Sequence, residues 1–189
     1  VKVFENVSGT SYAQAVSQTI QVNIASDTTP FLYPNQFCNF NADSNVVTVS
    51  DTITSGMTDP LKKVEAIYNY AVDNITYDNQ KTVQSGYLPN VDATLAQKKG
   101  ICFDYAAVMT SMLRAQGIPT KLVIGYAGNV YHAWVSVYIQ GQGWVDNIIY
   151  FDGTDWKLMD PTFVSSGKKS AEVLNYVSNP ANYRQKFCY

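Results

Sequence analysis

The sequence predicts an α+β protein in which a central helix packs against an antiparallel sheet, and two patterns carry that prediction. Apolar residues recur at helical spacing from Pro60 to Asn74 and from Cys102 to Ala115. After Pro119 the apolar residues alternate with a period of two, in runs separated by turns of hairpin length. Helices followed by hairpin-linked strands are typical of the α+β class.

Both helices have recognisable ends. Asp59 is a good N-cap, and Pro60 suits the first helical position, where a missing N–H costs nothing. The second helix follows Gly100, and Gly117 with Pro119 ends it. Cys102 therefore falls in the first turn of a helix. The stretch from Gln84 to Asn90, with its Gly and Pro, is expected to be a loop.

The strands follow one another in a meander. Their expected ranges are Thr120 to Tyr126, Tyr131 to Ile139, Trp144 to Phe151 and Trp156 to Met159. The last strand ends at Asp160-Pro161, because proline cannot continue the ladder of hydrogen bonds. We expect one more short helix from Ala171 to Val177.

The composition is that of a compact globular protein. Its 189 residues suit one domain, and 46% are hydrophobic while 15% are charged. The net charge of −2 gives no electrostatic footprint for nucleic acid. No apolar stretch is long enough to span a bilayer. We therefore expect a monomer that neither binds nucleic acid nor inserts into a membrane.

The predicted organisation has three parts within one compact domain. Residues 1–58 form an N-terminal extension packed on the core, residues 59–166 form the catalytic core, and residues 167–189 form a C-terminal tail. The extension contains short alternating runs such as Val46 to Val49, and Tyr12 to Ala25 fits either a helix or a strand.

The start of the chain and its polar residues bear on the compartment of the protein. The chain begins at Val1 without a Met, which suggests that a signal segment was removed. Polar residues are more often Asn, Thr, Ser, Gln and Tyr than Lys and Glu. We expect an extracellular or cell-surface protein.

Cys102 is the candidate nucleophile. A thiol attacks as its thiolate, and a helix N-terminus favours that anion through its unpaired N–H groups and dipole. The alternative is an inert buried cysteine. The chain has no CxxC spacing and a single histidine, so a zinc site lacks ligands. We expect no metal and no cofactor, and activity that survives chelators.

His132 and Asp160 are the candidate partners of the cysteine. His132 begins a strand directly after a turn and shares a strand face with Trp134, Ser136 and Tyr138, opposite the apolar face. Asp160 ends a strand and could orient the imidazole by accepting its N–H. A structural histidine and an ordinary turn aspartate are the alternatives.

Three motifs, in order, resemble those of the transglutaminase-like superfamily in its bacterial secreted form. They are Gly100 to Ala106 with Leu113 to Pro119, Tyr131 to Val135, and Trp156 to Thr162; Ala66 to Asp78 resembles the preceding helix. The resemblance covers roughly residues 59–163. It implies a papain-like core and a triad of Cys102, His132 and Asp160.

The resemblance also suggests a secondary site residue. It places a tyrosine, Tyr77, where it could help to bind the oxyanion beside the Cys102 N–H. Tyr126, Tyr131 and Trp134 are candidates for a substrate groove. Each of these four rings has a plain packing role as its alternative.

Three further residues have structural interpretations. Cys38 and Cys188 are expected to form a disulfide, since three cysteines less one nucleophile leave a pair; two separate buried thiols are the alternative. Asp104 is expected to stabilise the first turn of its helix, and Arg114 to lie at the surface or in an ion pair.

The expected function is cysteine-nucleophile acyl transfer on amide bonds through a thioester, by transamidation or hydrolysis. The expected partner is a protein or peptide substrate, such as a cell-wall or surface protein. Two alternatives stay open. One is a cysteine peptidase that uses the same site, and the other is a non-catalytic adhesion or cell-wall-binding module.

Overall fold

The computed structural model describes residues 1–146, 150–151, 156–157 and 179–189. The helices are η1 (Thr29–Leu32), α1 (Asn45–Ile53), α2 (Pro60–Asn74), α3 (Val91–Gln97), α4 (Cys102–Ala115) and η2 (Pro180–Asn182). The strands are β1 (Lys2–Ser8), β2 (Ser11–Ser17), β3 (Thr76–Tyr77), β4 (Lys99–Gly100), β5 (Thr120–Ala127), β6 (Val130–Ile139), β7 (Gly143–Val145), β8 (Tyr150–Phe151), β9 (Trp156–Lys157) and β10 (Tyr183–Cys188).

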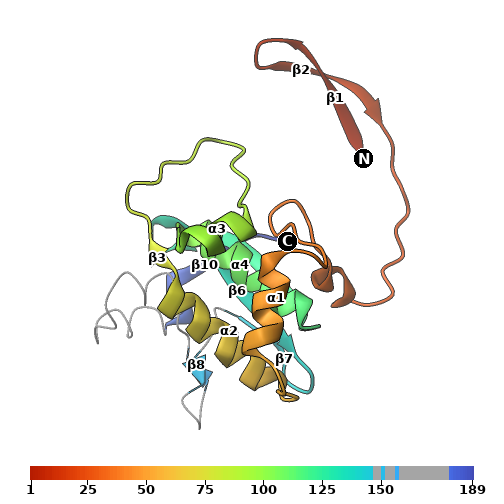
Figure 1. Ribbon diagram of the computed structural model, residues 1–189. Helices are drawn as coiled ribbons and strands as arrows, with labels where there is room; N and C mark the ends of the chain where they lie inside the picture. The colour runs from red at the N-terminus through yellow and green to blue at the C-terminus, as the bar shows by residue number, and fades with distance from the viewer. Residues whose placement is uncertain (147–149, 152–155, 158–178) are drawn as a thin grey trace.

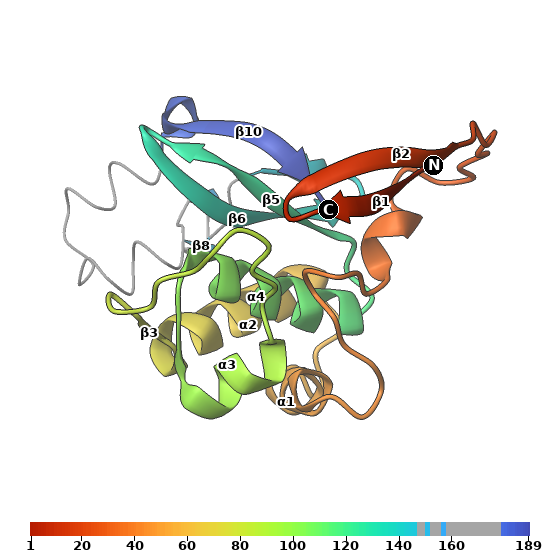
Figure 2. The same ribbon diagram turned by 90° about the horizontal axis from the view of Figure 1, so that it is seen from above.

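A four-stranded antiparallel sheet and a group of helices form two layers. The strand order of the sheet is β10-β5-β6-β7. Helix α4 packs on β5 and β6, and α1, α2 and α3 pack on α4 from its other side (Figures 1 and 2). The predicted α+β class, with a cysteine-bearing helix against an antiparallel sheet, is confirmed.

Helix α4 is the centre of the core. Its residues from Asp104 to Arg114 are all buried, because the sheet covers one side of the helix and the other helices cover the rest. The expectation that Arg114 lies at the surface or in an ion pair is wrong. Only 3% of this residue is exposed, and its guanidinium donates hydrogen bonds to backbone carbonyls.

Helix α2 begins and ends where the sequence predicts. The Asp59 carboxylate accepts a hydrogen bond from the Leu61 N–H at 2.9 Å, and Pro60 occupies the first turn. Its buried residues fall on one stripe, as helical spacing requires; they are Val64, Ile67, Tyr68 and Ala71.

The alternating run from Val46 to Val49 forms a helix and not a strand. In α1, Val46 and Ser50 are buried against the neighbouring helices, and the Asp92 carboxylate accepts a hydrogen bond from the Val46 N–H at 3.0 Å. Helix α1 thus belongs to the helical layer. Contacts between residues distant in sequence decide the structure of this segment, against its local alternation.

The ends of the chain also differ from the expected extension and tail. The strands β1 and β2 form a hairpin whose residues are all exposed, and Figure 1 shows it standing away from the two layers. The hairpin is therefore not packed on the core. At the other end, β10 pairs with β5 and completes the central sheet. The described tail is thus part of the central sheet.

The hairpin of β5 and β6 holds its strands in close register. Gly128 turns the chain with a φ of +60°, and Gly125 lies opposite His132. A Cβ on Gly125 would lie 2.2 Å from the Arg184 carbonyl oxygen and 2.7 Å from the Trp134 ring. Only glycine therefore permits β10 to approach here.

The later strands are described in part. Within the expected strand from Trp144 to Phe151, β7 pairs with β6 in the central sheet, whereas β8 pairs with β9 in a separate two-stranded sheet. Strand β9 covers the first residues of the next expected strand. Asp160 and the expected helix from Ala171 to Val177 lie outside the described residues.

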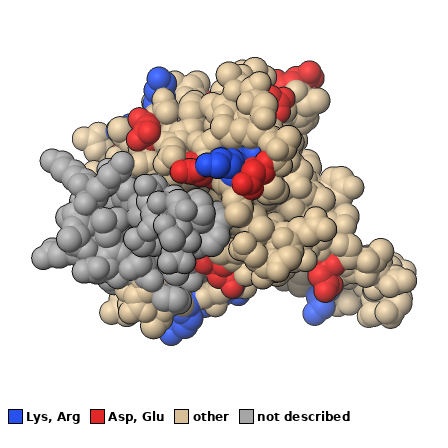
Figure 3. Space-filling view, turned by 90° about the horizontal axis from the view of Figure 1, so that it is seen from below, with Lys and Arg blue, Asp and Glu red and all other residues tan. Residues whose placement is uncertain are grey.

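Only 15% of the residues are charged. On the face shown in Figure 3, the acidic and basic side chains are scattered and form no large patch of one sign. Of the helices that the structure describes, none combines the length and apolar character that a membrane span requires.

Candidate active site

Cys102 is the first residue of α4 and is half-buried. The helix start is held by Asp104, whose carboxylate accepts a hydrogen bond from the Ile101 N–H at 2.9 Å. Gly100 is needed for this arrangement, because a Cβ there would lie 2.6 Å from the Cβ of Asp104. The predicted role of Asp104 in the first turn is confirmed.

A short parallel pair of strands brings Tyr77 to the start of α4. Strand β3 pairs with β4, so that Tyr77 lies opposite Gly100. The Asp78 N–H donates to the Gly100 carbonyl at 2.9 Å, which extends the pairing past the strand ends. A residue 25 positions before Cys102 in sequence is in this way placed beside it.

Asp104 also anchors the loop that follows β3. Its buried carboxylate accepts hydrogen bonds from the Lys81 ammonium at 2.6 Å and from the Tyr87 hydroxyl. Burial opposes the charge of Lys81, but hydrogen bonds to Asp104 and Tyr87 raise its pKa above the ordinary value. Burial, followed by the hydrogen bond to Asp104, raises the pKa of Tyr87.

Sequence reasoning missed this cluster of Lys81, Tyr87 and Asp104. Loop residues follow no period, so nothing in the pattern marks Lys81 or Tyr87 as partners of Asp104. Two polar residues inside a predicted loop, next to a buried helix start, are the only signal that could have suggested it.

Replacing Lys81 by Met should destabilise the protein by about 1–2 kcal/mol near pH 7, because the Asp104 carboxylate loses its charged partner. The pKa of Lys81 is raised, so its contribution is complete below the unfolded pKa of about 10.4 and is lost as the pH rises through the folded pKa. Urea unfolding at a series of pH values measures this.

The matched control is Lys99→Met, which removes a cation from the more exposed ion pair with Asp78 at 3.0 Å. That change should cost no more than about 0.5 kcal/mol. An equal loss in both variants, or a Lys81 effect that persists unchanged at strongly alkaline pH, would contradict the role given to Lys81.

Cys102 and His132 line one cavity of about 320 Å³, although they lie on different layers of the fold. Tyr77 and Tyr131 line it as well. The full lining is Tyr77, Lys81, Val83, Ile101, Cys102, Phe103, Ile124, Tyr131, His132 and Ala133. The structure thus brings four of the predicted site residues to one hollow with a largely apolar wall.

Trp134 and Tyr126 do not line this cavity. The Trp134 ring is buried between His132, at a centroid distance of 6.2 Å, and Tyr183, at 5.3 Å, and it lines a separate cavity of about 140 Å³. This placement matches the packing alternative for Trp134. The Tyr126 ring contacts the Tyr131 ring at a centroid distance of 5.5 Å, so Tyr126 adjoins a residue of the cavity wall.

The two faces of β6 are both covered, contrary to the expectation of a single core face. His132, Trp134 and Ser136 are as buried as the apolar residues between them. The reason is that α4 covers one face of β6, while side chains such as Tyr183 from β10 reach across the other.

The predicted disulfide is not formed, and the three cysteines are free. Cys38 is buried, where the Arg114 guanidinium donates to its sulfur at 3.2 Å, whereas Cys188 lies exposed on β10. Burial raises the pKa of Cys38, against the opposing effect of the Arg114 charge.

Metal ligands do not gather in the described part of the chain. Across residues 1–146 and the shorter described segments, no three His, Cys, Asp or Glu side chains come close enough to hold an ion.

Both a family model and a known protein match the sequence of this chain. The family model of the transglutaminase-like superfamily matches residues 47–147. The uncharacterized protein YebA of Bacillus subtilis (strain 168) is 29% identical over 147 residues, which are 67% of this chain and 19% of that protein. The chain therefore spans only a fraction of that relative's length.

Two solved structures share the fold. A cysteine protease candidate from Cytophaga hutchinsonii superposes with a TM-score of 0.60 at 20% identity, over 88% of this chain and 48% of that one. The periplasmic domain of TgpA from Pseudomonas aeruginosa has a TM-score of 0.52 at 24% identity, over 74% and 50%. At these identities the likeness concerns the fold alone.

Proposed function

We propose that this chain, which belongs to the transglutaminase-like superfamily, catalyses acyl transfer from amide bonds through a thioester on Cys102. The family is one of cysteine-dependent enzymes. The proposal names the reaction and the residues: Cys102 as nucleophile, His132 as general base and Asp160 as the residue that orients the histidine.

One observation carries the proposal. Cys102 lies at the N-terminus of a 14-residue helix and shares a cavity with His132, the single histidine of the chain. The helix end favours a thiolate, and an imidazole can take the thiol proton near neutral pH. The wall of the cavity is largely apolar, and closure of such a site around a substrate strengthens the electrostatic interactions within it.

The reaction proceeds in two halves. His132 takes the proton of Cys102, the sulfur attacks the amide carbonyl carbon, and the resulting oxyanion accepts hydrogen bonds from the Cys102 N–H and the Tyr77 hydroxyl. The C–N bond then breaks as the imidazolium returns the proton to the leaving amine. Water or a second amine attacks the thioester, and its proton passes through His132 to the departing sulfur.

Asp160 is included in the proposed triad because the motif that contains it resembles that of the family. Its carboxylate accepts the second N–H of the imidazole, which selects the tautomer that can take the thiol proton. The same interaction stabilises the imidazolium that forms during the reaction.

The proposed substrate is a protein or peptide outside the cytoplasm, such as a cell-wall or surface protein. Support for that location comes from TgpA, whose matching region is a periplasmic domain. Tyr131, which is exposed at the cavity rim, offers a surface for the polypeptide around the reacting amide.

A glutamine-containing peptide, offered with and without an excess of a primary amine, tests the reaction. Product masses should show loss of ammonia, with amine incorporation for transamidation or conversion to glutamate for hydrolysis. Cys102→Ala should abolish both, while the matched control Cys188→Ala, on an exposed strand, should leave turnover unchanged.

Other outcomes would redirect the proposal. Cleavage of the peptide backbone would assign the same cavity to a cysteine peptidase. Absence of turnover with every donor, together with a Cys102 that reacts slowly with alkylating agents, would favour the non-catalytic adhesion module.

A further inference from the structure

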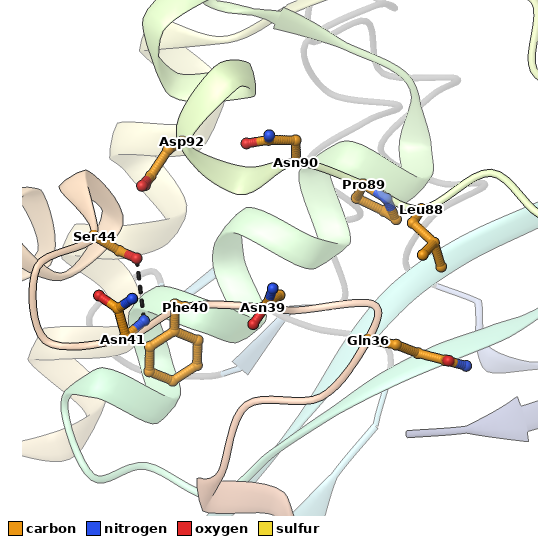
Figure 4. Close-up of a pocket in the computed structure, with 9 residues that line it drawn as sticks. All are labelled: Gln36, Asn39, Phe40, Asn41, Ser44, Leu88, Pro89, Asn90 and Asp92. Carbon is orange, nitrogen blue, oxygen red and sulfur yellow. Dashed lines mark hydrogen bonds between the residues drawn. The ribbon is translucent and has the colours of Figure 1, made fainter.

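We propose that a second cavity, of about 410 Å³, binds neutral saccharides (Figure 4). It lies where the loop that leads into α3 faces the segment that leads into α1. Its lining residues are Gln36, Asn39, Phe40, Asn41, Ser44, Leu88, Pro89, Asn90 and Asp92. None of them is among the predicted site residues.

The saccharide cavity is separate from the cysteine cavity. The two share no lining residue. The ring of Phe103 stands between them, since it lines the cysteine cavity and contacts Phe37 at 5.6 Å and Tyr87 at 6.3 Å. Phe37 and Tyr87 are the chain neighbours of Gln36 and Leu88 at the other cavity. A ligand can therefore occupy this cavity without entering the first.

Two amide groups at the cavity are held in fixed orientations. The side-chain oxygen of Asn90 accepts a hydrogen bond from the Ala93 N–H at 3.0 Å, and that of Asn41 accepts one from the Asp43 N–H at 2.8 Å. Because each oxygen is bound to the backbone, each NH₂ group is presented as a positioned donor. Such preorganisation lowers the entropic cost of binding.

Acceptors are positioned in the same way. One oxygen of Asp92 accepts the Val46 N–H at 3.0 Å, which fixes the carboxylate and presents its second oxygen. The Ser44 hydroxyl accepts the Asn41 N–H at 3.1 Å, as Figure 4 shows, and can still donate its own hydrogen. The lining of the cavity thus includes both donors and acceptors.

The charge and hydrogen-bonding character of the lining side chains favours a neutral saccharide as the ligand. The nine lining residues include no Lys or Arg, so the cavity offers no cation to a phosphate, a sulfate or a uronic acid. Sugar hydroxyls both donate and accept, which matches amides beside a carboxylate and a hydroxyl. Phe40 and Leu88 add apolar surface for the C–H face of a sugar ring, and the volume falls in the range of small-molecule sites.

The test uses the whole chain and three neutral trisaccharides: cellotriose, maltotriose and triacetylchitotriose. We expect at least one to bind in calorimetry and to shift the side-chain NH₂ resonances of Asn41 and Asn90 in NMR spectra. Absence of binding by all three at millimolar concentration would overturn the proposal, as would binding that shifts only resonances elsewhere.

Asn90→Asp is the decisive variant. A carboxylate still accepts the Ala93 N–H and caps α3, but the NH₂ donor is gone. Saccharide affinity should fall about tenfold, as expected for one hydrogen bond. The control is Asn179→Asp, which makes the same exchange at an exposed residue whose oxygen accepts the Ala181 N–H at 3.1 Å. Equal affinity in both variants would contradict the assignment.

The result is independent of the proposed reaction. Binding should be the same in Cys102→Ala, because the cysteine lies in the other cavity. Failure of acyl transfer would leave the saccharide result standing, and the reverse also holds. Binding of a neutral Asn- and Gln-containing peptide at this cavity, with no saccharide bound, would assign it to polypeptide and overturn the proposal.

Discussion

His132→Gln is expected to slow the alkylation of Cys102 at pH 7 by about tenfold or more. The thiolate is the form that reacts, and in the variant the sulfur loses the group proposed to take its proton. Both residues line the same cavity, so the pairing can be tested without knowing the substrate. Peptide mass spectrometry after timed exposure to iodoacetamide measures each thiol separately.

The other two thiols serve as internal references. Cys188 is exposed and Cys38 is buried with a raised pKa, so neither rate should respond to the change at His132. An unchanged Cys102 rate in the variant would show that the proposed pairing is wrong. A parallel change at all three thiols would instead report altered folding.

Asp160 is expected to contribute to turnover by orienting the imidazole of His132. Asp160→Asn should lower turnover by about 10⁴-fold, by analogy with serine triads, because the amide favours the wrong imidazole tautomer.

Cys102→Ala should remove covalent chemistry while the fold persists, since Cys102 is half-buried at a helix start and outside the core cluster. Circular dichroism of each variant checks the fold.

Arg114→Met should destabilise the protein by about 3 kcal/mol or more. The guanidinium donates to the carbonyls of Thr120 and Tyr189, at 2.7 Å each, and to that of Tyr33. Methionine fills a similar volume but leaves these carbonyls without their charged donor, and each such loss costs about 1–3 kcal/mol. Urea unfolding measures the change.

Two further variants sharpen this test. Arg114→Lys should recover little stability, because one ammonium cannot span carbonyls that the planar guanidinium reaches together. Arg184→Met removes an exposed guanidinium that lies 5.0 Å from the Tyr126 ring, and should cost no more than about 1 kcal/mol. A similar loss of unfolding free energy in the Arg114 and Arg184 variants would mean that the buried hydrogen bonds of Arg114 add no stability beyond that of an exposed guanidinium.

The elements with strong local signals were predictable. Helix α2 has a cap, a proline and an apolar stripe, and α4 is bounded by glycines; both match to the residue. The hairpin of β5 and β6 follows from alternation and a turn glycine. In these segments the local preference and the tertiary environment favour the same structure, so sequence reasoning suffices.

The candidate site was predictable only in part. The sequence pointed to Cys102 and His132, because a helix start and the single histidine are chemically conspicuous. It could not tell that Trp134 lines another cavity, since strand alternation assigns a residue to a face but not to the element that covers that face.

The sequence thus determined the fold class, the two main helices and the residues that can act as nucleophile and base. Only the tertiary structure decided that Val46 lies in a helix, that Arg114 is buried, that Cys38 and Cys188 are free thiols, and that β10 joins the sheet. Each of these depends on contacts between residues far apart in the chain. Such contacts leave no local period in the sequence, because the same side chains are compatible with more than one local structure until their partners are in place.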